Sequence, residues 1–259
     1  MSQQERGERF RALHEGEPFV IPNPWDAGSA RMLEALGFHA LATTSSGFAF
    51  THGRLDGDVT LDDVVEHVRA LCAATALPVS VDLENGYGDA AAAITRVAEA
   101  GAVGGSIEDF DRDGGLLAVE AAAERVAAAA DAARALDFPF MLTGRAENHL
   151  HGVSDLDDTI VRLQAYEAAG ADVLYAPGLR EIDQVRAICS AVGRPVNVLG
   201  HAGFSLAEVF DAGAQRVSVG GALTWVGVRA AADAAEQLRD GDLSVLTARV
   251  PLSEWFETK

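Results

Sequence analysis

A short sequence motif that ends in glycine occurs four times along the chain, each time directly before a run of apolar residues. The copies are Ala35-Leu-Gly37, Glu99-Ala-Gly101, Ala169-Gly170 and Asp211-Ala-Gly213. Glycine just past a helix permits the left-handed backbone that ends the helix before a turn. Four such endings predict repeated helix-to-strand connections, which are typical of chains that alternate helices with parallel strands.

Short runs of β-branched and other apolar residues supply the matching strands. Several lack polar–apolar alternation, which favours strands that are buried on both faces. The runs are Phe19–Pro22, His39–Thr44, Pro78–Leu83, Gly104–Glu108, Phe138–Thr143, Asp172–Ala176, Pro195–Leu199 and Arg216–Gly220. Eight strand–helix units in a chain of 259 residues predict one (β/α)8 TIM barrel domain over 1–259, with a short C-terminal tail. A doubly wound open sheet is the alternative, but it usually has fewer strands and the chain contains no G-x-G-x-x-G.

The charge balance excludes some partners. The chain has 20 Lys and Arg against 39 Asp and Glu, a net charge of −19. Nucleic acid and anionic membranes both require basic patches, so we expect neither as a partner. No apolar run reaches transmembrane length, and the polar N-terminus lacks the apolar region of a secretory signal. Cys72 and Cys189 show no disulfide or metal spacing, so we expect a cytoplasmic protein.

Two carboxylates follow the third predicted strand. Asp82 and Glu84 stand two residues apart, and a turn containing Gly86 and Gly88 follows at once. Alternation along a strand would place both carboxylates on one face. There they could hold one hard divalent cation, directly or through water. The alternative is a strand that runs into an ordinary acidic turn.

Polar residues are dense where the predicted strands end. In such a barrel the carboxyl ends of the strands build the active site. The polar residues there are Asn23, Asp26, Thr44, Ser45, Ser46, Asp82, Glu84, Glu108, Asp109, Arg145, Glu147, Tyr175, Asn197, His201 and Ser218. Carboxylates that converge on one rim repel one another unless a cation is bound, and carboxylates with water suit Mg²⁺.

Arg145 and the segment Ser45–Gly47 have two interpretations each. Arg145 could form a bidentate pair with a substrate carboxylate, or a structural ion pair with Glu108 or Glu147. The backbone N–H groups of Ser45, Ser46 and Gly47 could bind an anion, or the segment could be a plain loop.

Four further residues have weaker signals. His201 could transfer a proton, or it could be a loop histidine without function. Trp25 and Tyr87 are expected as pocket walls rather than chemical groups. Asp26 is expected to cap a helix.

Four motifs, in order and at matching spacing, resemble the isocitrate lyase/phosphoenolpyruvate mutase superfamily. They are Gly37–Gly47, Val81–Gly88, Ser106–Asp109 and Gly144–Glu147. The resemblance spans nearly the whole chain, from Pro22 to Gly221. It implies a (β/α)8 barrel whose last helix is exchanged with a neighbouring subunit, in a dimer or tetramer.

The resemblance also implies a metal site and a ligand. It implies Mg²⁺, with Mn²⁺ as a substitute, held mostly through water by Asp82, Glu84 and Glu108, with Asp56 a looser match. The ligand is a small α-keto or 2-hydroxy acid, or its enolate. The resemblance places Ser45, Ser46, Gly47, Arg145 and Asn197 around this ligand, and we expect Trp25 and Asp82 to bind it as well.

The segment after the fourth strand departs from the family. The lyases carry a K-[KR]-C-G-H loop there, whereas Phe110–Leu116 is short and has no Cys, Lys or His. A substitute acid is therefore needed, with Tyr87, His201 or a metal-bound water as candidates. With these candidates, the expected catalytic residues are Arg145, Glu108, Tyr87 and His201.

The resemblance therefore implies a Mg²⁺-dependent carbon–carbon lyase that works through an enolate. The expected reaction is a retro-aldol cleavage or a decarboxylation, of the 2-methylisocitrate lyase or oxaloacetate decarboxylase type. One alternative is carbon–phosphorus chemistry of the phosphonomutase type. The other is a protein that binds an α-keto acid without turning it over.

Overall fold

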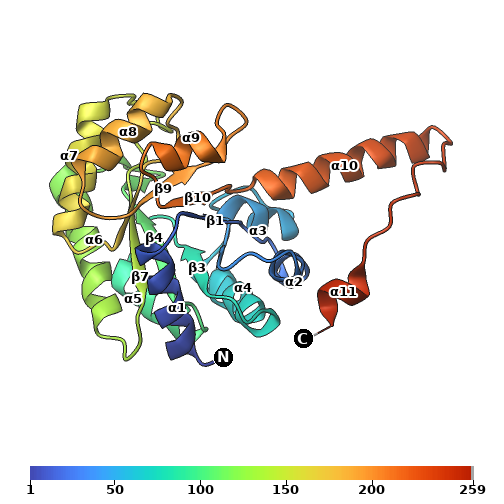
Figure 1. Ribbon diagram of the computed structural model, residues 1–259, viewed down its shortest axis with the longest axis horizontal. Coiled ribbons are helices and arrows are strands. Elements are labelled where there is room, and N and C mark those ends of the chain that lie inside the picture. Colours follow the sequence, from blue (N-terminus) through green and yellow to red (C-terminus); the bar gives the residue numbers. More distant parts are fainter. Residues whose placement is uncertain (258–259) are drawn as a thin grey trace.

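Eight parallel strands form a nearly closed barrel in the computed structural model, which describes residues 1–257 (Figure 1). They are β1 (Phe19–Ile21), β2 (Leu41–Ala42), β3 (Val79–Asp82), β4 (Gly104–Glu108), β7 (Met141–Arg145), β8 (Val173–Tyr175), β9 (Val196–Leu199) and β10 (Arg216–Ser218). Around the barrel the order is β1-β10-β9-β8-β7-β4-β3-β2. Each predicted strand is confirmed, although β7 begins three residues later than expected and extends to Arg145.

The barrel has one seam, between β1 and β2, which are the two ends of the hydrogen-bonded strand order. Beside these strands the Ala42 N–H donates to the Pro22 carbonyl at 3.1 Å. The Asn23 side chain bridges the same gap, donating to the Thr43 carbonyl at 2.9 Å and accepting the Val219 N–H at 2.9 Å. Asn23 therefore links three neighbouring segments at the mouth of the barrel.

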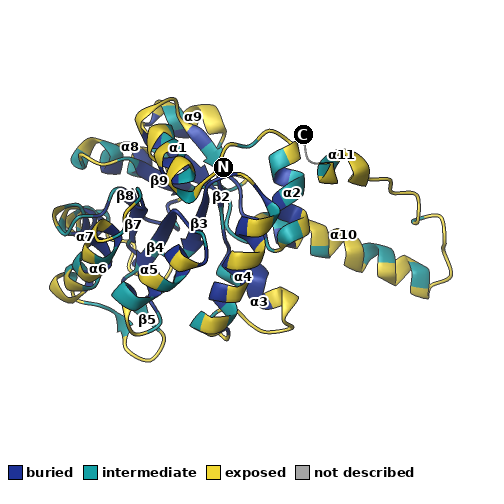
Figure 2. Cartoon of the chain, turned by 90° about the horizontal axis from the view of Figure 1, so that it is seen from below, coloured by how far each residue is buried: buried dark blue, intermediate teal, exposed yellow. Residues whose placement is uncertain are grey.

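Helices surround the strands, and their outward faces are exposed (Figure 2). They are α1 (Gln3–Glu15), α2 (Ala27–Ala35), α3 (Ser45–Thr51), α4 (Leu61–Ala74), α5 (Ala90–Glu99), α6 (Val119–Arg134), α7 (Leu156–Ala168), α8 (Ile182–Ala191) and α9 (Leu206–Asp211). The expected glycines follow their helices with left-handed φ angles: 89° at Gly37, 110° at Gly101, and 104° at both Gly170 and Gly213. These endings direct the chain back into the barrel, as predicted. Within residues 1–257 no helix is long and apolar enough to cross a membrane.

Two last helices leave the body of the barrel. α10 (Ala222–Arg239) projects outward, and Thr224 is its buried residue (Figure 1). The chain then returns to α11 (Leu252–Phe256), which packs on α2. There the Arg31 guanidinium carbon lies 5.2 Å from the centre of the Phe256 ring. The exchange of a last helix between subunits stays a prediction.

A small hairpin follows β4, in the short segment that stands where the family's lyases carry their catalytic loop. Its strands are β5 (Phe110–Asp111) and β6 (Gly115–Leu116), which the sequence did not predict as strands. Arg125 of α6 contacts both carboxylate oxygens of Asp111 at 2.9 Å. Arg112 at the hairpin tip pairs with Asp58 at 3.0 Å. The hairpin thus lies over the rim at the carboxyl ends of β3 and β4.

Candidate active site

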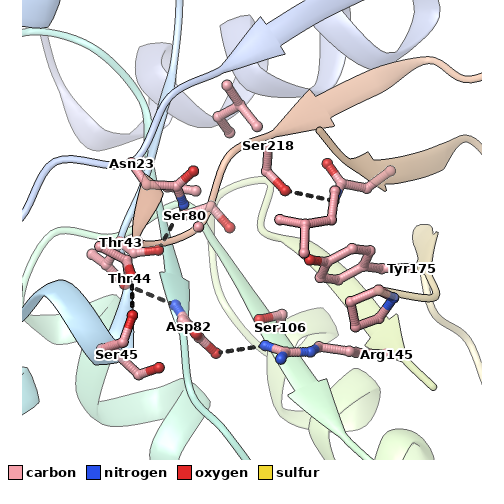
Figure 3. A pocket seen from close by; sticks show the side chains of 18 of the residues that line it. Asn23, Thr43, Thr44, Ser45, Ser80, Asp82, Ser106, Arg145, Tyr175 and Ser218 are labelled. Carbon is pink, nitrogen blue, oxygen red and sulfur yellow. Dashed lines mark hydrogen bonds and ion pairs between the residues drawn. The ribbon is translucent and has the colours of Figure 1, made fainter. Parts of the chain in front are cut away.

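Arg145, the last residue of β7, is the centre of the polar cluster at the mouth of the barrel (Figure 3). Its Nη1 atom lies 3.3 Å from Asp82 Oδ1 and 3.4 Å from Glu108 Oε2, and its Nε donates to Glu147 Oε1. Burial alone would lower the pKa of Arg145, but Glu108, Glu147 and Asp82 outweigh it and raise that pKa well above its ordinary value. The Tyr175 ring lies 5.4 Å from the guanidinium carbon. The guanidinium is therefore fixed and permanently charged.

The segment after β3 turns sharply instead of continuing as a strand. The strand ends at Asp82, and Glu84 has a left-handed φ of 48°. Alternation along a strand was thus the wrong reason to place the two carboxylates together. They are close because the turn brings the Glu84 N–H to Asp82 Oδ1 at 3.3 Å. The Tyr87 hydroxyl, from a residue with φ 54°, donates to Glu84 Oε1 at 3.0 Å. A non-glycine residue in this backbone region is strained, and such strain clusters at functional sites.

Four acidic side chains, those of Asp82, Glu84, Glu108 and Glu147, share this cluster with a single arginine, Arg145. Burial, with Asp82 adding to it, raises the pKa of Glu84 to about 7. Burial also raises the pKa of Glu108 well above its usual value, against the opposing effect of Arg145. Within residues 1–257 no three acidic, histidine or cysteine side chains are near enough to ligate one ion together. This set of oxygen donors could hold a hard cation largely through water, and the cation would favour the ionised form of the carboxyl groups.

Two cavities meet at Arg145. The inner one, of about 150 Å³, enters the barrel between Asp82, Asn197 and Ser218. The outer one, of about 710 Å³, lies under the β5–β6 hairpin. Residues that line both are Ser45, Asp56, Arg145 and Leu150. The size of the inner cavity suits one end of a small acid rather than a nucleotide.

A second buried cation lies at the floor of the inner cavity. Arg216, which opens β10, donates to Asn197 Oδ1 at 2.8 Å and to Thr143 Oγ1 at 3.1 Å. Its Nη1 lies 3.0 Å from His14 Nε2 of α1. Burial lowers the pKa of His14 to about 3, so that ring is neutral and accepts. Burial lowers the pKa of Arg216 to about 10, yet it stays charged at neutral pH and, within residues 1–257, pairs with no carboxylate. This floor favours an anionic ligand.

The sequence analysis missed Arg216 as a site residue. The one available signal was an arginine inside a run otherwise typical of a buried strand, Arg216–Gly220. Asn197, which was predicted, is held between this arginine and Ser218, whose Oγ accepts from Asn197 Nδ2 at 2.9 Å.

The predicted anion-binding segment forms the first turn of α3. Ser45 and Ser46 line the inner cavity, as expected. The N–H of Gly47 is directed to Thr44 Oγ1 at 3.4 Å instead. A Cβ at Gly47 would lie 2.5 Å from Thr224 Oγ1, so the glycine allows close packing of α3 on α10. Trp25 packs beside Gly47 and lines neither cavity, which differs from its expected place in the pocket wall.

Asp109 points away from the site, contrary to its expected place at the rim. It is 1% exposed, and its carboxylate pairs with Arg162 of α7 at 3.0 Å. It also accepts from the Tyr166 hydroxyl and from the Glu147 N–H, the latter at 2.8 Å. Asp109 therefore fixes the backbone at Glu147. Asp26 caps α2 by accepting the Ser29 N–H at 2.7 Å, as predicted.

His201 is separated from the polar cluster. It lies in an apolar hollow, its ring centre 4.1 Å from that of Phe204, and its Nδ1 accepts the Gly203 N–H at 3.0 Å. The structure therefore does not bring His201 together with Arg145. Tyr87, Glu108 and Glu84 do line the outer cavity with Arg145.

At the carboxyl ends of the barrel strands, a rim of carboxylates surrounds one arginine. Enzymes with this barrel fold build their active sites at the same place. Residues 10–239 match the sequence model of the phosphoenolpyruvate phosphomutase family. The chain belongs to this family, within the isocitrate lyase/phosphoenolpyruvate mutase superfamily.

Three relatives illustrate the likeness. An oxaloacetate decarboxylase of Rhodopseudomonas palustris (strain HaA2) is 35% identical over 233 residues, covering 85% of this chain and 78% of the relative. A solved structure from Burkholderia cenocepacia J2315, assigned by inference as a lyase/mutase, is 52% identical with a TM-score of 0.95, covering 99% of this chain and 97% of that one. A phosphonomutase from the same strain, also assigned by inference, is 35% identical with a TM-score of 0.83, covering 93% and 100%.

Proposed function

We propose that this protein is a carbon–carbon lyase that decarboxylates or cleaves a small α-keto or 2-hydroxy polycarboxylate, with oxaloacetate as the first candidate. The observation that carries the proposal is the pair of fixed cations, Arg145 at the mouth and Arg216 at the floor of the inner cavity. Both arginines line the inner cavity, so the anionic groups of a small acid could pair with them. The 35% identity to an oxaloacetate decarboxylase supports the same class of substrate.

Asp82, Glu84 and Glu108 are the residues proposed to hold Mg²⁺, or Mn²⁺ in its place, mostly through water. Asp56 lines both cavities and could complete the set. A bound divalent cation would polarise the substrate carbonyl and offset the charge that develops on its oxygen. The excess of carboxylates over arginine in the cluster supports this assignment.

The chain's own residues are proposed to bind and orient the acid. Three carboxylates hold the Nε and Nη1 atoms of Arg145, while its Nη2 forms no hydrogen bond within residues 1–257. We therefore propose that Nη2 donates to a ligand oxygen. A fixed, desolvated guanidinium stabilises enolate charge better than a mobile one, because it needs no reorganisation during the reaction. Ser45, Ser46 and Asn197 would complete the contacts to the substrate carboxylate.

Carbon–phosphorus chemistry is the second candidate function. The matched family is described as phosphoenolpyruvate phosphomutase, and one relative is assigned as a phosphonomutase. Against it, the hairpin that replaces the family loop offers Arg112 as its one basic residue, and Asp58 pairs with it.

A turnover screen by proton NMR with Mg²⁺ tests the proposal. The panel contains oxaloacetate, isocitrate, 2-methylisocitrate, other substituted malates, phosphoenolpyruvate and phosphonopyruvate. We expect pyruvate from oxaloacetate, with turnover lost in D82A and kept in D62A, which alters an exposed aspartate of α4 paired with Arg96. A phosphonate product would favour the second candidate. Silence across the panel with ligand binding intact would refute lyase activity and favour a binding protein.

A further inference from the structure

His151 lies on the loop between β7 and α7, six residues after Arg145. It lines the outer cavity together with Arg145, Glu108 and Tyr87. Its ring stacks on Phe110 of β5, with 3.4 Å between ring centres and 6° between planes. The hairpin that replaces the family's longer loop therefore holds an imidazole over the mouth of the barrel.

One carboxylate joins this ring to Arg145. Glu147 Oε2 lies 3.5 Å from His151 Nε2, and Glu147 Oε1 accepts from Arg145 Nε. The Glu147 side chain is only 4% exposed, and its backbone is fixed by the buried Asp109. A carboxylate in this position orients an imidazole ring. The His151 side chain is 34% exposed, so it can exchange protons with water.

The other groups considered for proton transfer are less suitable. The Tyr87 hydroxyl is engaged with Glu84, and burial raises the pKa of Tyr87 far above its usual range. His201 lies in a different hollow. Cys72 and Cys189 lie in α4 and α8.

We propose that His151 is the acid that protonates the carbon of the enolate left after bond cleavage, a role that rests on the proposed lyase function. When the carbon–carbon bond breaks, its electron pair passes into the enolate. The imidazolium of His151 then gives its proton to the nucleophilic carbon, a C–H bond forms, and neutral imidazole remains. Water returns a proton to the ring, so no oxidant, reductant or further reactant is needed.

Hydrogen exchange of pyruvate tests this step apart from cleavage. In D₂O with Mg²⁺, the wild-type protein should exchange the methyl hydrogens of pyruvate for deuterium, followed by proton NMR. Positioned acid–base groups contribute about 10²- to 10⁴-fold, so His151→Gln should slow exchange at least about hundredfold. Pyruvate affinity, measured by calorimetry, should change less than about threefold, because the proton donor is not the carboxylate anchor.

His149→Gln is the matched control on the same loop. His149 Nε2 contacts Thr159 Oγ1 at 2.9 Å, a contact that a glutamine amide can replace, and His149 lines neither cavity. Its exchange rate should stay near the wild-type rate. In His151→Ala, added imidazole should restore exchange, which a purely structural role would not allow.

The outcomes separate the two proposals. Exchange that depends on His151 without cleavage of any panel substrate would refute the lyase function and keep the role of His151. Equal exchange in wild type and His151→Gln, or no exchange in wild type, would overturn the role of His151 whatever the cleavage result.

Discussion

Removal of the Asp109 carboxylate should cost about 3 kcal/mol of folding free energy. The group is 1% exposed and accepts three hydrogen bonds, from Arg162 Nη1, the Tyr166 hydroxyl and the Glu147 N–H. Breaking a buried ion pair by removing one partner costs about 3–5 kcal/mol, because the other charge is left unpaired. Asp158 still contacts Arg162 Nε at 2.8 Å, which places Asp109→Ala at the lower end of that range.

Urea denaturation followed by circular dichroism measures this loss. Asp131→Ala is the matched control, since Asp131 forms an ion pair with Arg134 in which the side chains are 78% and 58% exposed. Exposed pairs contribute at most about 1 kcal/mol, so the control should stay within that limit. A loss for Asp109→Ala no larger than that of the control would refute the argument that the buried network stabilises the fold.

Three further changes have defined outcomes. Because burial and Asp82 raise the pKa of Glu84 to about 7 from 4.5, the metal-free protein should lose stability as pH rises across that interval. Mg²⁺ binding displaces the proton from Glu84, so the affinity of the protein for Mg²⁺ should rise up to about tenfold per pH unit below pH 7. A Mg²⁺ affinity that does not change with pH, measured by calorimetry, would contradict this. Arg145→Lys should lower kcat/KM roughly hundredfold with little change in melting temperature, because an ammonium lacks the planar fork; unchanged kinetics would show that charge alone suffices. Gly57→Ala should cost about 1–2 kcal/mol in urea denaturation, since Gly57 has φ 75° and a Cβ would meet the Arg112 guanidinium; full stability would argue against the close approach.

The strands were predictable because their signals are local. A glycine such as Gly101 ends its helix by a backbone property of its own, and a run such as Gly104–Glu108 is apolar where it is buried. The residues at the strand ends were found for the same reason, since the carboxyl ends of parallel strands meet at one rim.

The direction of each side chain was not predictable, because it depends on partners far along the chain. Glu108 and Asp109 are adjacent, yet one faces Arg145 and the other faces Arg162 from a helix 53 residues later. His151 escaped notice because its significance comes from Phe110, which only the fold brings against it. These contacts leave no periodic trace in the sequence.

The seam between β1 and β2 gives the barrel a preferred place to open. Elsewhere strand ladders resist separation, but here the Ala42 N–H and the Asn23 side chain hold the gap. Local opening is cheapest where few bonds must break, so the amides of Ala42 and Val219 should exchange hydrogen before those of the neighbouring ladders. Thr43 and Ser218 line the inner cavity from opposite sides of this seam. A ligand that contacts both sides would slow hydrogen exchange at the amides of Ala42 and Val219. Slower exchange at these two amides would therefore report directly that a ligand occupies the inner cavity.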